Sequence, residues 1–119
     1  MFEEADLIFS YSRADAIRDG VLIDVSSRAK SLGYRIPVAL IAGLYDALTA
    51  GAKDEAEISA RVDLLLITLR DSIAGNPGAG DRLDFVVKAP TLSLLSAWAL
   101  CGPGDTPDPV LTVMLPHED

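Results

Sequence analysis

The chain has 119 residues, of which half are apolar, with a formal net charge of −8 and a single cysteine. This length suits one domain, residues 1–119, with a core that needs no disulfide. The longest apolar run is shorter than the roughly 20 residues that cross a bilayer, and the acidic N-terminus is unlike a signal peptide. The charge disfavours free nucleic acid as a ligand and suits either a basic protein surface or simple solubility. We therefore expect a cytoplasmic protein without a membrane segment.

The segment DLIFSYSRADAIRDGVLIDV, near the N-terminus, predicts a short helix followed by a short strand. Ser12 can cap the helix by accepting a hydrogen bond from the amide three residues later, and Gly20 can end it. Residues 21–25 then alternate as a strand does. Ser26 or Ser27 would cap a second helix of one or two turns.

The next segment, YRIPVALIAGLYDALTAG, predicts a longer helix. Pro37 suits the first helical position, where its missing N–H costs nothing, and Gly51 suits the end. Gly43 inside this helix would cost roughly 1 kcal/mol relative to alanine, which indicates close packing against another backbone. Four apolar residues share one face at helical spacing: Val38, Ile41, Tyr45 and Leu48.

The strongest predicted helix is DEAEISARVDLLLITLRDSIAG. Asp54 and Glu57 have the spacing of a capping box, and acids are favourable at the positive end of a helix. Six apolar residues form a stripe at helical spacing, so this helix should lie on the core: Ile58, Val62, Leu65, Leu66, Leu69 and Ile73.

The rest of the chain is rich in strand signals. RLDFVVKAP and PVLTVMLP read as strands, and CGPGDTPDP would join the last two strands in a hairpin with a long tip. The run at 92–100 suits a helix or a buried strand, and its strand neighbours favour the strand. We predict an α+β fold: an antiparallel sheet of three or more strands, mainly C-terminal, with the N-terminal and central helices packed on one face.

Three stretches of the chain resemble a known family: DLIFSYSRADAIRDGVLIDVS, YRIPVALIAGLYDAL and CGPGDTPDPVLTVMLPHED. The family consists of small bacterial proteins of unknown function that are carried on plasmids, phages and integrated mobile elements. The similarity covers the first fifty residues and the last twenty. It implies a mobile-element context, and the family brings no known activity or catalytic residue to transfer.

The chain lacks the residue sets of common catalytic and metal sites. The only histidine, His117, lies near the C-terminus, where chains usually fray. Cys101 has no basic residue within about twelve positions that could lower its pKa, and suits a core or strand-end thiol. One cysteine and one histidine cannot supply the three nitrogen or sulfur ligands of a typical zinc site. We expect no catalytic residues, no metal and no cofactor.

A ligand site remains one alternative for the N-terminal region. Polar groups at the end of an element can bind a nucleotide or phosphate, and five residues could line such a pocket: Ser10, Tyr11, Arg13, Asp24 and Arg35. The structural alternative makes Tyr11 a packed ring with a hydrogen-bonded hydroxyl and Asp24 the partner of Arg28 or Arg35. This structural alternative is the one that we favour.

The leading functional hypothesis is a stoichiometric protein–protein interaction. A concrete version is an inhibitor of a host defence nuclease, anti-CRISPR or anti-restriction, whose acids imitate nucleic-acid phosphates against a basic groove. A third hypothesis is a self-associating module, a homodimer formed through Leu92, Leu94, Trp98 or Leu111 of the C-terminal sheet. The candidate acids of the interaction surface are Asp54, Glu55, Glu57, Asp105, Asp108, Glu118 and Asp119.

Overall fold

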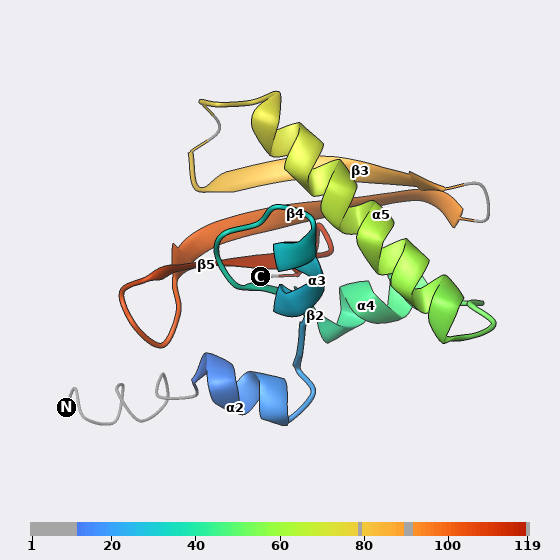
Figure 1. The fold of residues 1–119 in the computed structure, drawn as a ribbon, viewed down its shortest axis with the longest axis horizontal. Helices are drawn as coiled ribbons and strands as arrows, with labels where there is room; N and C mark the ends of the chain where they lie inside the picture. Colours follow the sequence, from blue (N-terminus) through green and yellow to red (C-terminus); the bar gives the residue numbers. More distant parts are fainter. Residues whose placement is uncertain (1–11, 79, 90–91, 119) are drawn as a thin grey trace.

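The computed structural model describes residues 12–78, 80–89 and 92–118, and its centre is a five-stranded sheet in the order β1-β2-β5-β4-β3 (Figure 1). All neighbouring strands are antiparallel except β2 and β5, which are parallel. The α+β class with long C-terminal strands is therefore confirmed. The strands are β1 (Leu22–Asp24), β2 (Val38–Ile41), β3 (Arg82–Ala89), β4 (Leu92–Pro103) and β5 (Pro109–Met114).

The main core lies between one face of this sheet and three helices: α3 (Ser26–Ser31), α4 (Ala42–Thr49) and α5 (Glu55–Ala74). In Figure 1, α5 crosses the sheet beside β3 and β4. The predicted apolar stripe of α5 is confirmed in its middle, where Leu65, Leu66 and Leu69 are fully buried. Sheet residues that point to the same side, such as Val87 and Val113, complete this core. We call this side the helical face.

The helix α2 (Arg13–Arg18) is an exception to the expected arrangement of helices on one face. Its Ala16 packs with Leu22 and Ala39 in a separate small cluster. Ala39 alternates with Val38 and Leu40, which belong to the main core, so α2 lies on the opposite side of the sheet. We call this side the open face.

The predicted helix over the second apolar segment is wrong in its first third. Residues 38–41 form strand β2, and α4 begins only at Ala42. Pro37 is not a first helical residue, because its carbonyl accepts a hydrogen bond from the amide of Leu111 on β5. Val38, Ala39 and Leu40 are all fully buried, as in a central strand that is covered on both faces.

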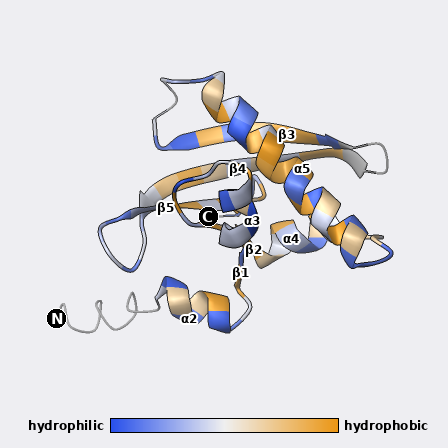
Figure 2. Ribbon diagram, viewed as in Figure 1, coloured by the Kyte–Doolittle hydropathy of each residue, from blue (hydrophilic) through white to orange (hydrophobic). Residues whose placement is uncertain are grey.

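The ambiguous run at 92–100 is a strand, and it continues to Pro103. Strands β4 and β5 form the expected antiparallel hairpin, with Pro103 opposite Pro109. Figure 2 shows hydrophilic loops around a framework whose hydrophobic segments lie in the strands, α4 and α5. No helix in the described part of the chain is both long and apolar enough to cross a membrane.

Three of the local predictions about caps and glycines have clear outcomes. Ser12 accepts from the Asp15 amide as predicted. Ser26 does not cap α3; its hydroxyl instead bonds the amide and carbonyl of Val38. Gly43 does pack closely, but against a side chain and not a backbone, because a Cβ there would collide with the carboxylate of Glu118.

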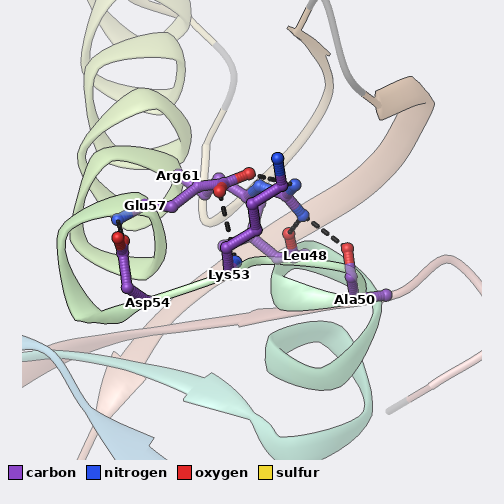
Figure 3. A network of polar contacts seen from close by, with 6 residues as sticks. All are labelled: Leu48, Ala50, Lys53, Asp54, Glu57 and Arg61. Atoms are coloured by element: carbon purple, nitrogen blue, oxygen red, sulfur yellow. Dashed lines mark hydrogen bonds and ion pairs between the residues drawn. The ribbon is translucent and has the colours of Figure 1, made fainter.

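The junction of α4 and α5 is held by one buried cation (Figure 3). Arg61 donates through Nη1 to the carbonyls of Leu48 (3.1 Å) and Ala50 (2.6 Å), at the end of α4. Its Nη2 donates to Glu57 Oε2 at 2.8 Å. The predicted cap also lies here, since Asp54 accepts from the Glu57 amide at 2.9 Å, but the Glu57 carboxylate accepts from the Lys53 amide and not from that of Asp54, so the capping box is only half formed. Arg61 therefore closes the C-terminus of one helix onto the start of the next.

Candidate functional site

The open face is organised by the docking of α2 against the β4–β5 hairpin. The carboxylate of Asp105, in the hairpin loop, accepts from the amides of Arg13 (2.6 Å) and Ala14 (3.0 Å). The Arg13 guanidinium donates to Thr112 Oγ1 and to the Leu111 carbonyl, both at 2.8 Å. Burial lowers the pKa of Arg13, and the nearby carboxylates of Asp24 and Asp105 oppose this shift. Asp105 of the hairpin loop thus binds backbone of α2, and Arg13 of α2 binds β5, so the two elements hold each other in place.

A groove of about 560 Å³ runs between α2 and the hairpin. Its floor is apolar and small, since it includes Leu22, Leu100 and Val110 together with glycines of the β4 end. Glycine leaves the backbone open to close approach by another chain. The groove therefore offers apolar surface and backbone together with the polar side chains of Arg13, Asp105 and Thr112, which also line it.

An apolar strip continues from the groove along β3 and β4. Leu94 is 68% exposed, and Val86 and Leu100 are each 39% exposed. Val86 lies opposite Ser96 in the ladder, and positions 94, 96 and 100 of β4 alternate onto the same side of the sheet. Leu94, Val86 and Leu100 are thus presented on the open face, and we call them the apolar strip. Val86 and Leu100 were not singled out from the sequence, although the two-residue period of the strands points to them.

Trp98 interrupts this strip without being exposed itself. The Arg82 guanidinium lies 3.8 Å from the centre of the indole ring, a cation–π contact. The indole N–H donates to the carbonyls of Leu115 and Glu118, each at 3.1 Å. Trp98 therefore anchors the C-terminal segment, and of the four residues expected to mediate a dimer only Leu94 is seen to be exposed. Leu111 is buried, and the side chain of Leu92 lies outside the described residues.

The two segments that border the groove are acidic. The α2 region carries Asp15 and Asp19, and the hairpin loop carries Asp105 and Asp108. Arg18 forms ion pairs with both α2 acids, at 2.9 and 3.5 Å. With Arg13 counted, the two segments carry four acids and two bases, a formal balance of −2, and of these charged residues Arg13 and Asp105 line the groove itself. An apolar floor with an acidic border favours a partner that presents an apolar group among basic residues.

The structure does not gather the predicted ligand residues into one pocket. Arg13 lines the α2 groove, whereas Arg35 is exposed and lines separate depressions beyond the hairpin loop. Asp24 lines none of these; its carboxylate accepts from the Ser26 amide at 3.0 Å. Asp24 is therefore not the partner of Arg28 or Arg35. Ser10 and Tyr11 lie outside the described residues.

Arg28 instead forms a two-bond ion pair with Asp63 of α5, at 2.7 and 2.6 Å. This pair joins α3 to α5 on the outside of the helical face. It holds the pKa of the Asp63 carboxyl below its usual value, mainly through the hydrogen bond from Arg28.

The predicted interaction acids lie in three separate places. Asp54, Glu55 and Glu57 occupy the start of α5, and Asp105 and Asp108 occupy the hairpin loop at the other end of the long axis (Figure 1). Glu118 accepts from the Leu115 amide and lies against Gly43. Asp119 lies outside the described residues. The hairpin loop is the only one of these places that borders the groove.

The remaining reactive side chains stand alone. Cys101 is a half-buried residue of β4, and His117 is exposed after β5. Across residues 12–78, 80–89 and 92–118, no three His, Cys, Asp or Glu side chains come together as a metal site would require. The candidate functional site is therefore the groove and the apolar strip of the open face.

Taken together, these features define a small α+β protein in which α3, α4 and α5 cover one face of a mixed sheet, while the other face, where α2 docks, carries an apolar strip and a groove. Residues 1–75 match a family described as "Family of unknown function (DUF6573)", and the chain belongs to this family. No curated protein and no solved structure matches the chain.

Proposed function

We propose that this protein works by stoichiometric binding to another protein, with the open face as its docking surface. The observation that carries the proposal is the apolar strip, Leu94, Val86 and Leu100, which runs into the acid-bordered groove beside α2. Exposed apolar surface next to a polar border is typical of protein–protein contacts.

The partner that suits this surface presents an apolar anchor flanked by lysine or arginine. Asp15 and Asp19 in the α2 region and Asp108 in the hairpin loop, which flank the groove without lining it, would face those basic residues. Many nucleic-acid-handling proteins carry basic grooves of this kind. The proposed target is therefore a nuclease of host defence, of the CRISPR or restriction type, blocked at its nucleic-acid channel.

The setting of this activity is part of the proposal. The N-terminal and C-terminal stretches resemble proteins that are carried on plasmids, phages and integrated elements. Such an element would benefit from carrying an inhibitor of host defence. Its place of action would be the bacterial cytoplasm, where defence nucleases meet incoming DNA.

The first test is binding to a panel of purified CRISPR effector complexes and restriction enzymes. Leu100→Glu places a charge in the strip at the mouth of the groove and should weaken binding at least about tenfold, because a charge would be buried against the apolar anchor. Ile73→Glu is the matched control, since Ile73 is 42% exposed on α5, away from the open face. It should leave affinity unchanged.

Two results would contradict the proposal. One is equal loss of affinity in both variants, which would remove the open face as the docking surface. The other is binding that does not weaken as salt is raised, which would exclude charge complementarity with a basic groove.

A further inference from the structure

The strand β3 lies at the edge of the sheet, and its outer side is unpaired in the described structure. The amide of Cys101 on β4 donates to the carbonyl of Asp81 at 2.8 Å. In an antiparallel ladder, successive residues direct their N–H and C=O groups to opposite sides. The register shifts between Val87 and Ala89, where the extra residue lies on β4, because Val87 pairs with Leu95 and Ala89 with Leu92. The strand β3 therefore keeps its alternation, and the backbone groups of Arg82, Asp84, Val86 and Lys88 point outward, to the open edge.

We infer that two copies of this chain pair through β3, antiparallel and centred on Val86. A two-fold antiparallel pairing must bring outward-pointing residues opposite one another. Centring on Val86 places Val86 opposite its own copy and Asp84 opposite Lys88 of the second copy, twice by symmetry. About six backbone hydrogen bonds would then close the edge.

Charge selects this register over the two that centre nearer the start of β3. Centring on Phe85 would place Arg82 opposite Lys88, and centring on Asp84 would place two carboxylates opposite each other. Like charges directly opposite on paired strands are unfavourable, whereas opposite charges are favourable. Only the Val86-centred register of these three yields two carboxylate–ammonium pairs.

The side chains concerned are free to meet a second copy. The Asp84 side chain is 73% exposed, and its ion pair with Arg82 (3.2 Å) lies within the same strand. Lys88 is exposed, and Val86 is 39% exposed. On the helical face the same register places Phe85 near Val87 of the second copy, beside the cover of α5.

Strand pairing of this length buries less area than a typical permanent dimer, so the dimer should be reversible, with a dissociation constant on the order of micromolar. The inference goes beyond the proposed function; the two share Val86, whose side chain belongs to the apolar strip, but each is tested by its own measurement. A monomer that still bound a defence nuclease would overturn only the dimer.

The test is sedimentation of the full chain over a concentration series, with a charge swap at the paired positions. Lys88→Glu gives an edge with acids at both positions, and Asp84→Lys gives an edge with bases at both. Each variant alone should dimerise roughly thirtyfold more weakly or worse, because both cross-strand pairs become like-charged. An equimolar mixture of the two should form a heterodimer, and the double variant should regain the homodimer.

Asp46→Lys, which changes an exposed acid of α4 by the same charge, is the control and should dimerise like the parent chain. Circular dichroism of each variant verifies that it is folded. The inference is overturned if the parent chain stays monomeric up to roughly 1 mM. It is overturned equally if both single variants dimerise normally, or if Lys88→Glu strengthens the dimer, since the Phe85-centred register predicts that gain.

Discussion

Asp105 and Arg13 are separated by 92 positions in the sequence, yet they make reciprocal contacts. The carboxylate of Asp105 satisfies two amides at the start of α2, and the guanidinium of Arg13 satisfies groups on β5. A six-residue helix is too short to be stable alone, so its position depends on such tertiary contacts. Arg13, one of the residues that suggested a ligand site, therefore holds the border of the groove in place together with Asp105.

We predict that Asp105→Ala destabilises the docking of α2. The loss of a carboxylate that caps backbone amides typically costs about 1–2 kcal/mol. Hydrogen–deuterium exchange should show faster exchange over residues 13–19, and urea unfolding should show the lower stability. Asp108→Ala is the control, since its carboxylate accepts from Thr106 within the same loop, and its change should stay within about 0.5 kcal/mol. Equal effects of the two variants would refute the assigned role of Asp105.

At the scale of elements, the junction of α4 and α5 depends on a carboxylate whose charge is favoured in the folded state. The pKa of Glu57 is lowered, first by the hydrogen bond from the Lys53 amide and then by the one from Arg61. The folded state therefore binds a proton at Glu57 less readily than the unfolded chain does. This contribution to stability is present above the unfolded pKa and is lost as the pH falls through the lowered folded value.

We accordingly predict that stability falls as the pH drops below about 4.3, the ordinary value for glutamate, and that Glu57→Gln makes this fall shallower. The measurement is urea unfolding of both chains at neutral and acidic pH. Glu55→Gln is the control, because Glu55 is an exposed acid in the same first turn of α5. A parallel pH dependence of the Glu57→Gln variant and the parent chain would contradict the role of this carboxylate.

The same scale explains which elements were predictable. The caps at Ser12 and Asp54 and the apolar stripe of α5 were predictable, because each depends on residues that are close together in the sequence. The start of the second apolar segment was not predictable in this way. Val38 and Ile41 have the spacing of a helix, but a central strand needs only a continuous apolar run, and this segment satisfies both patterns. The parallel pairing of β2 with β5, which joins residues more than seventy positions apart, decides between the two.

At the scale of the whole molecule, the net charge is −8, but the acids singled out in the sequence do not form a single patch. They lie at the start of α5, in the hairpin loop and beside α4, and ion pairs with arginine engage Asp63 and Glu57. Composition predicts the total charge but not its distribution, because the distribution depends on how the chain is folded. The groove could not be read from the sequence for the same reason, since α2 and β5 form it from the two ends of the chain.

The central claim is that the open face binds one partner in a fixed ratio. The most direct measurement is a titration of a purified defence nuclease with this chain, followed by cleavage of its DNA substrate. The account predicts a loss of cleavage that is linear in added chain and ends at a fixed molar ratio, with the end point lost in Leu100→Glu. Inactivation at far below one chain per nuclease would contradict the account, because it would require turnover. Unchanged cleavage across the whole panel of defence nucleases would contradict it as well.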